Sequence, residues 1–201
     1  MKTIAGRLWA LVLCSMMALL VVGGVGKWVS DVGVGTLARV INTLPHIDML
    51  AEMRASAMVM RMSVNGHLTA LEIQDKDKLA AVIDAAAKSF AEQAEKYAKD
   101  GFADATDETL LKAEKDLLPG YTAALKEIME ASRGYDNSTA ERILKAKLEP
   151  LDEKLKAALA AHADYNRKLA AAVKEEAAGQ AATGTAVALA TILVCVIVVG
   201  L

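Results

Sequence analysis

Hydrophobic and polar residues are distributed unevenly along this chain. The two ends, residues 8–25 and about 183–201, carry no charged side chain, whereas the middle mixes Ala and Leu with Lys and Glu. Within the middle, apolar residues recur every three or four positions, which is the period of an amphipathic helix. The pattern therefore predicts an all-α protein.

Four helices are predicted in the middle of the chain. The first continues to about residue 71, the second covers 76–100, the third covers 106–133, and the fourth begins at Ser138 or Thr139. We expect Asp75 to cap the start of the second helix, and Gly101 and Gly134 to end the second and third. We expect Pro45, Pro119 and Pro150 to kink the helices without ending them. The apolar pattern resumes directly after Pro45 and keeps its phase on both sides of Pro150.

Each helix has one apolar stripe that should face the others. The predicted core contains Leu50, Met53, Ala57, Met60, Val64 and Leu68; Leu79, Ile83, Ala86, Phe90, Ala94 and Tyr97; Leu110, Leu117, Tyr121, Leu125, Ile128 and Met129; and Leu144, Leu148, Leu151, Leu155, Leu159, His162, Tyr165, Leu169 and Val173. Short loops make sequential helices antiparallel. The expected fold is an antiparallel up-down four-helix bundle between two transmembrane helices.

The two apolar ends are long enough to cross a bilayer. Eighteen helical residues span about 27 Å, close to the hydrocarbon thickness, and Trp9 and Trp28 lie at the edges of the first run. Lys2 and Arg7 favour a cytoplasmic N-terminus. We predict a cytoplasmic N-terminus at 1–7, a span at 8–26, a domain outside the cytoplasm at 27–181, in the periplasm for a bacterial protein, and a span at 182–201. A cleaved signal peptide is the alternative for the first run.

Charge and composition exclude several classes of function. The chain has 23 basic and 25 acidic residues, interleaved, for a net charge of −2, so nothing favours binding to nucleic acid. Its two cysteines both lie in the apolar ends, and His46 and His67 have no second ligand at metal spacing. We find no nucleophile with a base, no clustered carboxylates and no Gly-rich phosphate loop. We therefore expect no enzymatic activity, no metal and no cofactor.

Several short runs resemble one family of sensors. They are Leu44-Pro45 followed by Leu50-Ala51-Glu52-Met53-Arg54, then Tyr121 with Ala124-Leu125, and Leu155 to Asn166 in the last helix. With two flanking spans, the chain resembles the sensor module of bacterial methyl-accepting chemotaxis proteins. The resemblance implies a periplasmic four-helix bundle, anchored in a bacterial inner membrane, that binds a small ligand and signals to a cytoplasmic domain. No such domain is predicted in the chain, which ends at Leu201. Some histidine kinases and cyclases share this sensor type.

The candidate binding residues begin with two arginines of the first helix. Related receptors bind ligands in the distal half of the bundle, commonly with such arginines and across a dimer interface. Arg54 and Arg61 are seven residues apart and so share a helix face; their guanidinium groups suit the carboxylate of an organic acid or amino acid. Further candidates are Tyr121, Thr122 and Arg142. The alternative is that both arginines pair with surface acids such as Glu52 or Asp48.

Two polar residues of the fourth helix have a simpler interpretation. His162 and Asn166 lie on or beside its core stripe. Buried polar groups are usually satisfied by partners inside the protein, so we interpret both as core residues.

The resemblance also predicts how the module works. We expect a homodimer in contact with membrane lipid, in which an anionic ligand shifts the fourth helix and the second span between two positions. A different class of function remains open, namely a structural stalk that is anchored in the envelope and senses nothing.

Overall fold

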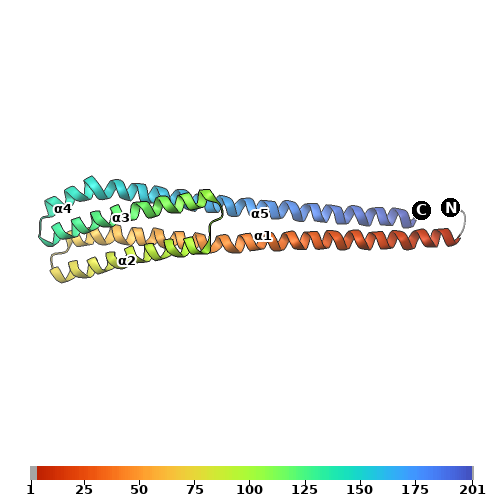
Figure 1. Cartoon of the computed structure of the whole chain (residues 1–201), viewed down its shortest axis with the longest axis horizontal. Coiled ribbons are helices and arrows are strands. Elements are labelled where there is room, and N and C mark those ends of the chain that lie inside the picture. The colour runs from red at the N-terminus through yellow and green to blue at the C-terminus, as the bar shows by residue number, and fades with distance from the viewer. Residues whose placement is uncertain (1–3, 201) are drawn as a thin grey trace. The chain divides into compact units, whose positions relative to one another are not determined.

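The computed structural model describes residues 4–200 of the chain, with every side chain from residue 45 to residue 191 (Figure 1). Its elements are α1 (Ile4–Thr69), α2 (Ile73–Asp100), α3 (Ala105–Arg133), α4 (Asn137–Ile143), the π-helical turn η1 (Leu144–Leu148) and α5 (Glu149–Gly200). The described residues contain no strand. The predicted all-α class is therefore confirmed.

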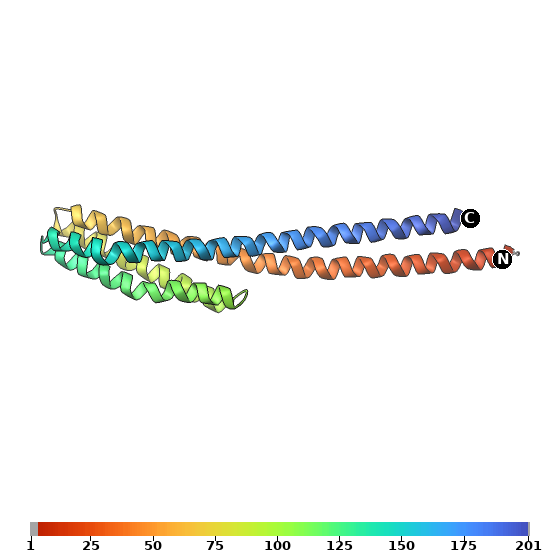
Figure 2. The ribbon, with the colours of Figure 1, turned by 90° about the horizontal axis from the view of Figure 1, so that it is seen from above.

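The chain divides into two compact units. One is the bundle, Thr43–Lys168, and the other comprises the terminal segments, Met1–Asn42 and Leu169–Leu201. Within the bundle the end of α1, α2, α3 and the run from α4 to α5 lie side by side, each antiparallel to the one before it (Figures 1 and 2). The predicted four-helix bundle is confirmed. The bundle lies inside the predicted domain 27–181, whose exact boundaries stay a prediction.

The described parts of the terminal segments, residues 4–42 and 169–200, are helical. Trp9 and Trp28, the two predicted edge residues of the first span, are exposed. Among the described residues, no helix has both the length and the apolarity that crossing a membrane requires. Residues 1–3 and 201, which belong to the predicted cytoplasmic end and second span, lie outside the described residues. The side chains of Cys14 and Cys195 also lie outside the description.

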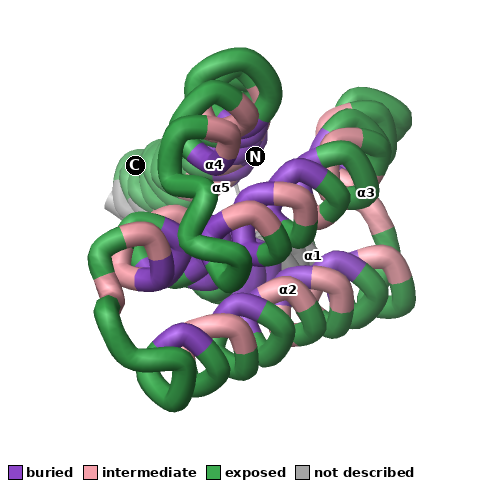
Figure 3. Tube along the Cα trace, turned by 90° about the vertical axis from the view of Figure 1, so that its left-hand side faces the viewer, coloured by how far each residue is buried: buried purple, intermediate pink, exposed green. Residues whose placement is uncertain are grey.

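The predicted apolar stripes form the core of the bundle. Figure 3 shows the buried parts of each helix turned toward the other helices. Deeply buried residues of the stripes come from all four helical segments and include Met53, Met60, Val64, Ile83, Phe90, Tyr97, Tyr121, Leu125, Ile128, Leu148 and Leu155. On α3, Leu111 is buried while the predicted Leu110 is only half-buried.

The helix starts differ from the prediction by up to three residues. The N-cap of α2 is Glu72, in extended backbone, and the expected cap Asp75 lies in the first turn. α3 is capped by Asp104, whose side chain accepts hydrogen bonds from the backbone N–H groups of Thr106 and Asp107. Asp136 caps α4 in the same way, by accepting from Thr139. The helix ends at Gly101 and Gly134 are as predicted.

Pro150 changes the hydrogen bonding of the last helix. Proline has no N–H and its ring collides with the carbonyl four residues earlier. The residues before it, Leu144–Leu148, form a π turn, and the N–H of Glu149 bonds to the carbonyl of Leu144. The wider turn lets the helix pass the proline without ending. The expected kinked helix is therefore a continuous helical run with one π turn.

A buried polar network joins three helices at the end of the bundle where α2 meets α3. His162 of α5 places Nε2 2.8 Å from Asp107 Oδ1 and Nδ1 3.0 Å from Glu114 Oε1, both on α3. Tyr97 of α2 donates its hydroxyl to Asp107 at 2.6 Å, and Asn166 donates to Tyr97 at 3.0 Å. All five side chains are fully buried. The interpretation of His162 and Asn166 as core residues agrees with this arrangement.

The carboxylates keep the histidine charged. Burial alone would lower the pKa of His162, but its hydrogen bonds to Asp107 and Glu114 raise that pKa to about 9. Burial would raise the pKa of Asp107, yet the hydrogen bonds from His162, Tyr97 and the Ala103 N–H lower it to about 2. Burial raises the pKa of Glu114 above its usual value. The core thus holds an imidazolium between two acidic side chains.

Because of this network, the folded chain should lose stability at alkaline pH. The pKa of His162 is higher in the folded chain than its ordinary value of 6.5, so its contribution is complete below pH 6.5 and is lost as pH rises through about 9. We expect the free energy of unfolding to fall by about 3 kcal/mol across this window, measured by urea titration of the full chain in detergent micelles. His162→Gln should remove the slope. His46→Gln should leave it, and a slope unchanged in His162→Gln would contradict this assignment.

Candidate functional site

Two of the five predicted site residues meet at one buried carboxylate. Asp152, in the first turn of α5, accepts a hydrogen bond from the Tyr121 hydroxyl at 3.1 Å. Nε of Arg61 lies 3.7 Å from the other carboxylate oxygen of Asp152. Arg61 belongs to α1 and Tyr121 to α3, so this contact connects three helices near the middle of the bundle.

Other groups complete the surroundings of Asp152. The exposed Lys156 lies one turn further along α5, with Nζ 2.7 Å from Asp152 Oδ2. Arg61 also lies 3.6 Å from Glu149 and donates to Asn65 at 2.9 Å. Burial, and next the charge of Asp152, raise the pKa of Tyr121, so its hydroxyl stays protonated and donates. The hydrogen bond to Asp152 likewise raises the pKa of Lys156.

These contacts change the chemistry available to Arg61. Its guanidinium is half-buried and already faces two carboxylates of α5. The partners are not the neighbours Glu52 or Asp48 but acids of a different helix. A ligand carboxylate at Arg61 would compete with Asp152 and Glu149. Arg61 is therefore better suited to positioning neighbouring residues than to binding a ligand directly.

Arg54 lies in a different environment from Arg61. It is exposed and forms no ion pair within the part of the chain that the structure describes. On the exposed face of the same helix, Met58 and Met62 show 60% and 65% of their surface to solvent. Arg54 is therefore an available cation beside an apolar surface.

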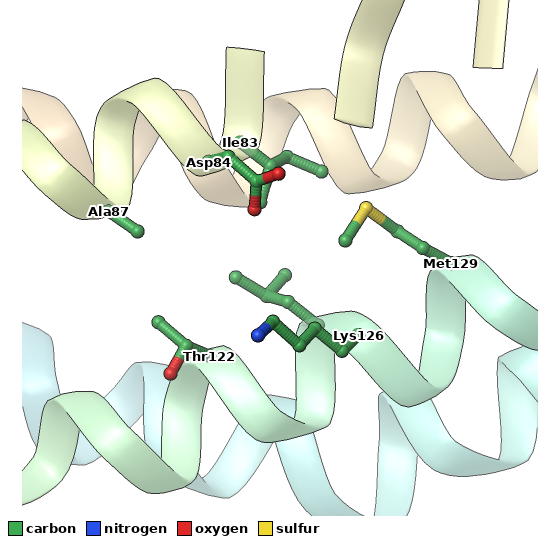
Figure 4. Close-up of a pocket in the computed structure, with 7 residues that line it drawn as sticks. Ile83, Asp84, Ala87, Thr122, Lys126 and Met129 are labelled. Atoms are coloured by element: carbon green, nitrogen blue, oxygen red, sulfur yellow. The ribbon is translucent and has the colours of Figure 1, made fainter. Parts of the chain in front are cut away.

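Thr122 faces a cavity between α2 and α3. The cavity measures about 200 Å³, and its lining residues are Ile83, Asp84, Ala87, Thr122, Leu125, Lys126 and Met129. Figure 4 shows Asp84 and Lys126 on opposite walls. The Thr122 hydroxyl donates to the backbone carbonyls of Leu118 and Pro119, so it could only accept from a ligand.

Arg142 stands apart from the other candidates. It is exposed on α4 and lines a surface hollow of about 520 Å³ together with Ser138, Glu141, Lys145 and Ala146. The structure thus joins Arg61 and Tyr121 at Asp152, and places Arg54, Thr122 and Arg142 on other surfaces. Whether these five residues bind a ligand stays a prediction.

The acids that organise these residues were not predicted from the sequence. Asp152 and Asp107 are buried, but both occur in stretches rich in charge and look like surface residues. The only available signal was position, since Asp152 lies one residue after Leu151 and three before Leu155 of the predicted stripe. No group of His, Cys, Asp and Glu side chains that could hold a metal ion occurs among the described residues.

Comparison with known proteins identifies one family. Residues 1–181 match a family model described as a four helix bundle sensory module for signal transduction. No curated protein and no solved structure matches the chain.

Asp152 should stabilise the bundle. Asp152→Asn leaves Arg61 without one of its carboxylates and weakens the hydrogen bond of a buried tyrosine, and we expect a loss of about 1–3 kcal/mol in the free energy of unfolding. This loss is measured by urea titration, with circular dichroism as the signal for unfolding. Glu153→Gln is the matched control, because Glu153 is exposed and also lies near Lys156. Equal losses in both variants would contradict the role of Asp152.

Proposed function

The chain belongs to the family of four-helix-bundle sensory modules for signal transduction, and on this premise we propose that it is the sensor of a bacterial chemoreceptor. In this proposal residues 8–26 and 182–201 cross the inner membrane and the bundle lies in the periplasm. The module has no catalytic role. It passes its signal to a cytoplasmic domain, and a histidine kinase or cyclase output is the alternative to a chemotaxis output.

We infer that the ligand is a small organic acid or amino acid bound at α1. The observation that carries this inference is Arg54, a cation with no ion pair in the described chain, seven residues from Arg61. A carboxylate accepts paired, charge-assisted hydrogen bonds from a guanidinium group. Arg61 is held by Asp152 and Glu149 and would orient the ligand-facing part of α1. Tyr121, Thr122 and Arg142 take secondary parts in the proposal.

The module acts as a homodimer in this proposal. The exposed residues Ala51, Ala55, Met58 and Met62 follow one another at spacings of four, three and four along α1. This is the spacing of the contact positions in a coiled coil. Exposed apolar residues at that spacing favour a second copy of α1 as the partner, and Arg54 would lie beside the resulting seam.

The signal is proposed to travel along α5. This helix runs from Glu149 to Gly200 and carries both Asp152 and His162, which tie it to α1 and α3. A ligand shifts such a helix only by the difference between its affinities for the two positions. A helix that stays packed along its length carries a displacement from one end to the other.

Ligand binding should depend on Arg54. We expect the full chain, in detergent micelles, to be stabilised in a thermal-shift screen by at least one compound among dicarboxylates, amino acids and aromatic carboxylates. Arg54→Ala should weaken that binding at least about tenfold. Arg167→Ala, at an exposed arginine of α5, is the control. No stabilisation by any compound would instead favour a stalk that senses nothing.

The dimer should depend on the exposed methionines. Replacing both Met58 and Met62 with Glu places charges along the proposed seam, and we expect the dimer of the full chain to dissociate at least about tenfold more readily. Light scattering of the protein in micelles measures the mass. Val82→Glu, at an exposed apolar position of α2, should have no effect. A dimer that survives the double substitution would rule out this face.

A further inference from the structure

The tip of the bundle contains a buried cation without a carboxylate. The tip is the end where the loop between α1 and α2 lies beside the loop between α3 and α4 (Figures 1 and 2). Lys76 of α2 is only 1% exposed there. Its ammonium donates to the backbone carbonyl and, at 3.0 Å, to the hydroxyl of Ser132. No acid of the described chain pairs with it, although an ammonium is costly to bury without an anion.

The charged groups next to Lys76 do not neutralise it. Asp77, the acid next to Lys76 in the sequence, pairs with Arg133 instead. His67 is fully buried, and burial followed by the charges of Lys76 and Arg133 lowers its pKa. His67 therefore stays neutral and accompanies Lys76 as a polar, uncharged neighbour that contacts Ser132. The arrangement would accept an anion from outside the chain.

Tyr135 covers Lys76 in an unfavourable backbone conformation. Its φ is +57°, the left-handed region that side chains other than Gly rarely adopt. The N–H groups of Tyr135 and Asp136 bond to the carbonyls of Ser132 and Ala131, which is a helix-end motif that usually has Gly where Tyr135 stands. The ring centroid lies 4.6 Å from the Lys76 ammonium. A tyrosine at this position does what glycine cannot: its hydroxyl donates to the carbonyl of Leu71, and its ring shields the Lys76 ammonium.

Beside Lys76 and Tyr135 lies a cavity of about 380 Å³. This volume is within the range of small-molecule sites. The cavity is lined by Leu68, Thr69, Ala70, Leu71, Lys76, Tyr135, Asn137 and Glu141. The lining therefore includes both Lys76 and Glu141, an exposed acid that has no ion pair in the described chain. The end of α1, where carbonyls carry partial negative charge, also lines the cavity through Leu68 and Thr69.

We propose that this tip cavity binds a small zwitterion, such as a free amino acid, with its carboxylate on Lys76 and its ammonium at Glu141. The ligand carboxylate takes the place of the Tyr135 ring at the Lys76 ammonium. Moving Tyr135 would then move the loop that starts α4. The binding stands by itself, and only its consequence as a signal rests on the sensory function proposed above.

A purely structural role for Lys76 explains less. A cation at the C-terminal end of α3 is favoured by the helix dipole, and an ammonium can bond the last carbonyls. A neutral donor would make the same bonds to Ser132, however, and neither reason requires a tyrosine in the left-handed region beside a cavity. Replacing the charge while keeping the donor therefore separates the two roles.

The test is calorimetric titration of the full chain in micelles with each of the twenty L-amino acids at millimolar concentration. For the tightest binder, the amide, which lacks the carboxylate, and the deaminated acid, which lacks the ammonium, are titrated as well. We expect both analogues to bind at least about tenfold more weakly. Equal binding of the amide would overturn the assignment to Lys76.

Matched variants locate the site. Lys76→Gln keeps a donor for Ser132 and should weaken binding at least about tenfold, whereas Lys78→Gln, at an exposed lysine of the same helix, should not. Glu141→Gln should also weaken binding. Because Glu141 is exposed, this variant tests the site even if Lys76→Gln fails to fold. Arg54→Ala should leave it unchanged, which distinguishes this cavity from the site at α1. Absence of binding by all amino acids, or binding that survives both Lys76→Gln and Glu141→Gln, would overturn the proposal.

Discussion

The contact of His162 with Asp107 and Glu114 is the constraint on which the bundle depends. An apolar stripe of Leu and Ala fits several registers of neighbouring helices almost equally well, and only 4% of this chain is aromatic. A buried imidazolium fits one register, because any slip along α5 leaves two acids without their cation. Tyr97 and Asn166 extend this condition to α2 and to the next turn of α5. Apolar burial drives the helices together, and the network specifies how they align.

The same principle recurs along the bundle. Asp152 ties α5 to α1 and α3 in the middle, and Lys76 ties α2 to the end of α3 at the tip. The π turn matters here, because an extra residue in a turn shifts the phase of every later side chain. Asp152 lies four residues after this turn and His162 fourteen, so the phase set near Pro150 determines the direction in which each of them points.

Local patterns made the helices predictable, whereas the contacts between helices were not. The stripe from Ile83 to Tyr97 follows from spacing alone, and Gly101 and Gly134 end their helices as expected. The start of α2 was misplaced because Asp75 is a better cap by type than Glu72. Arg61 and Asp152 lie on different helices far apart in sequence, so no spacing rule connects them. Lys76 resembles a surface lysine among Asp75, Asp77 and Lys78.

Two proposed sites on one bundle would act on different parts of it. A ligand at Arg54 would bind on the exposed face of α1 and would alter how two copies associate. A zwitterion at the tip would instead act within one copy, through the loop that precedes α4. Since α4 continues through η1 into α5, the tip has a direct covalent and hydrogen-bonded path to His162. If both ligands shift α5 between the same two positions, each must change the other's affinity by the same factor. Reciprocal coupling of the two ligands is therefore the thermodynamic mark of a module that integrates two signals.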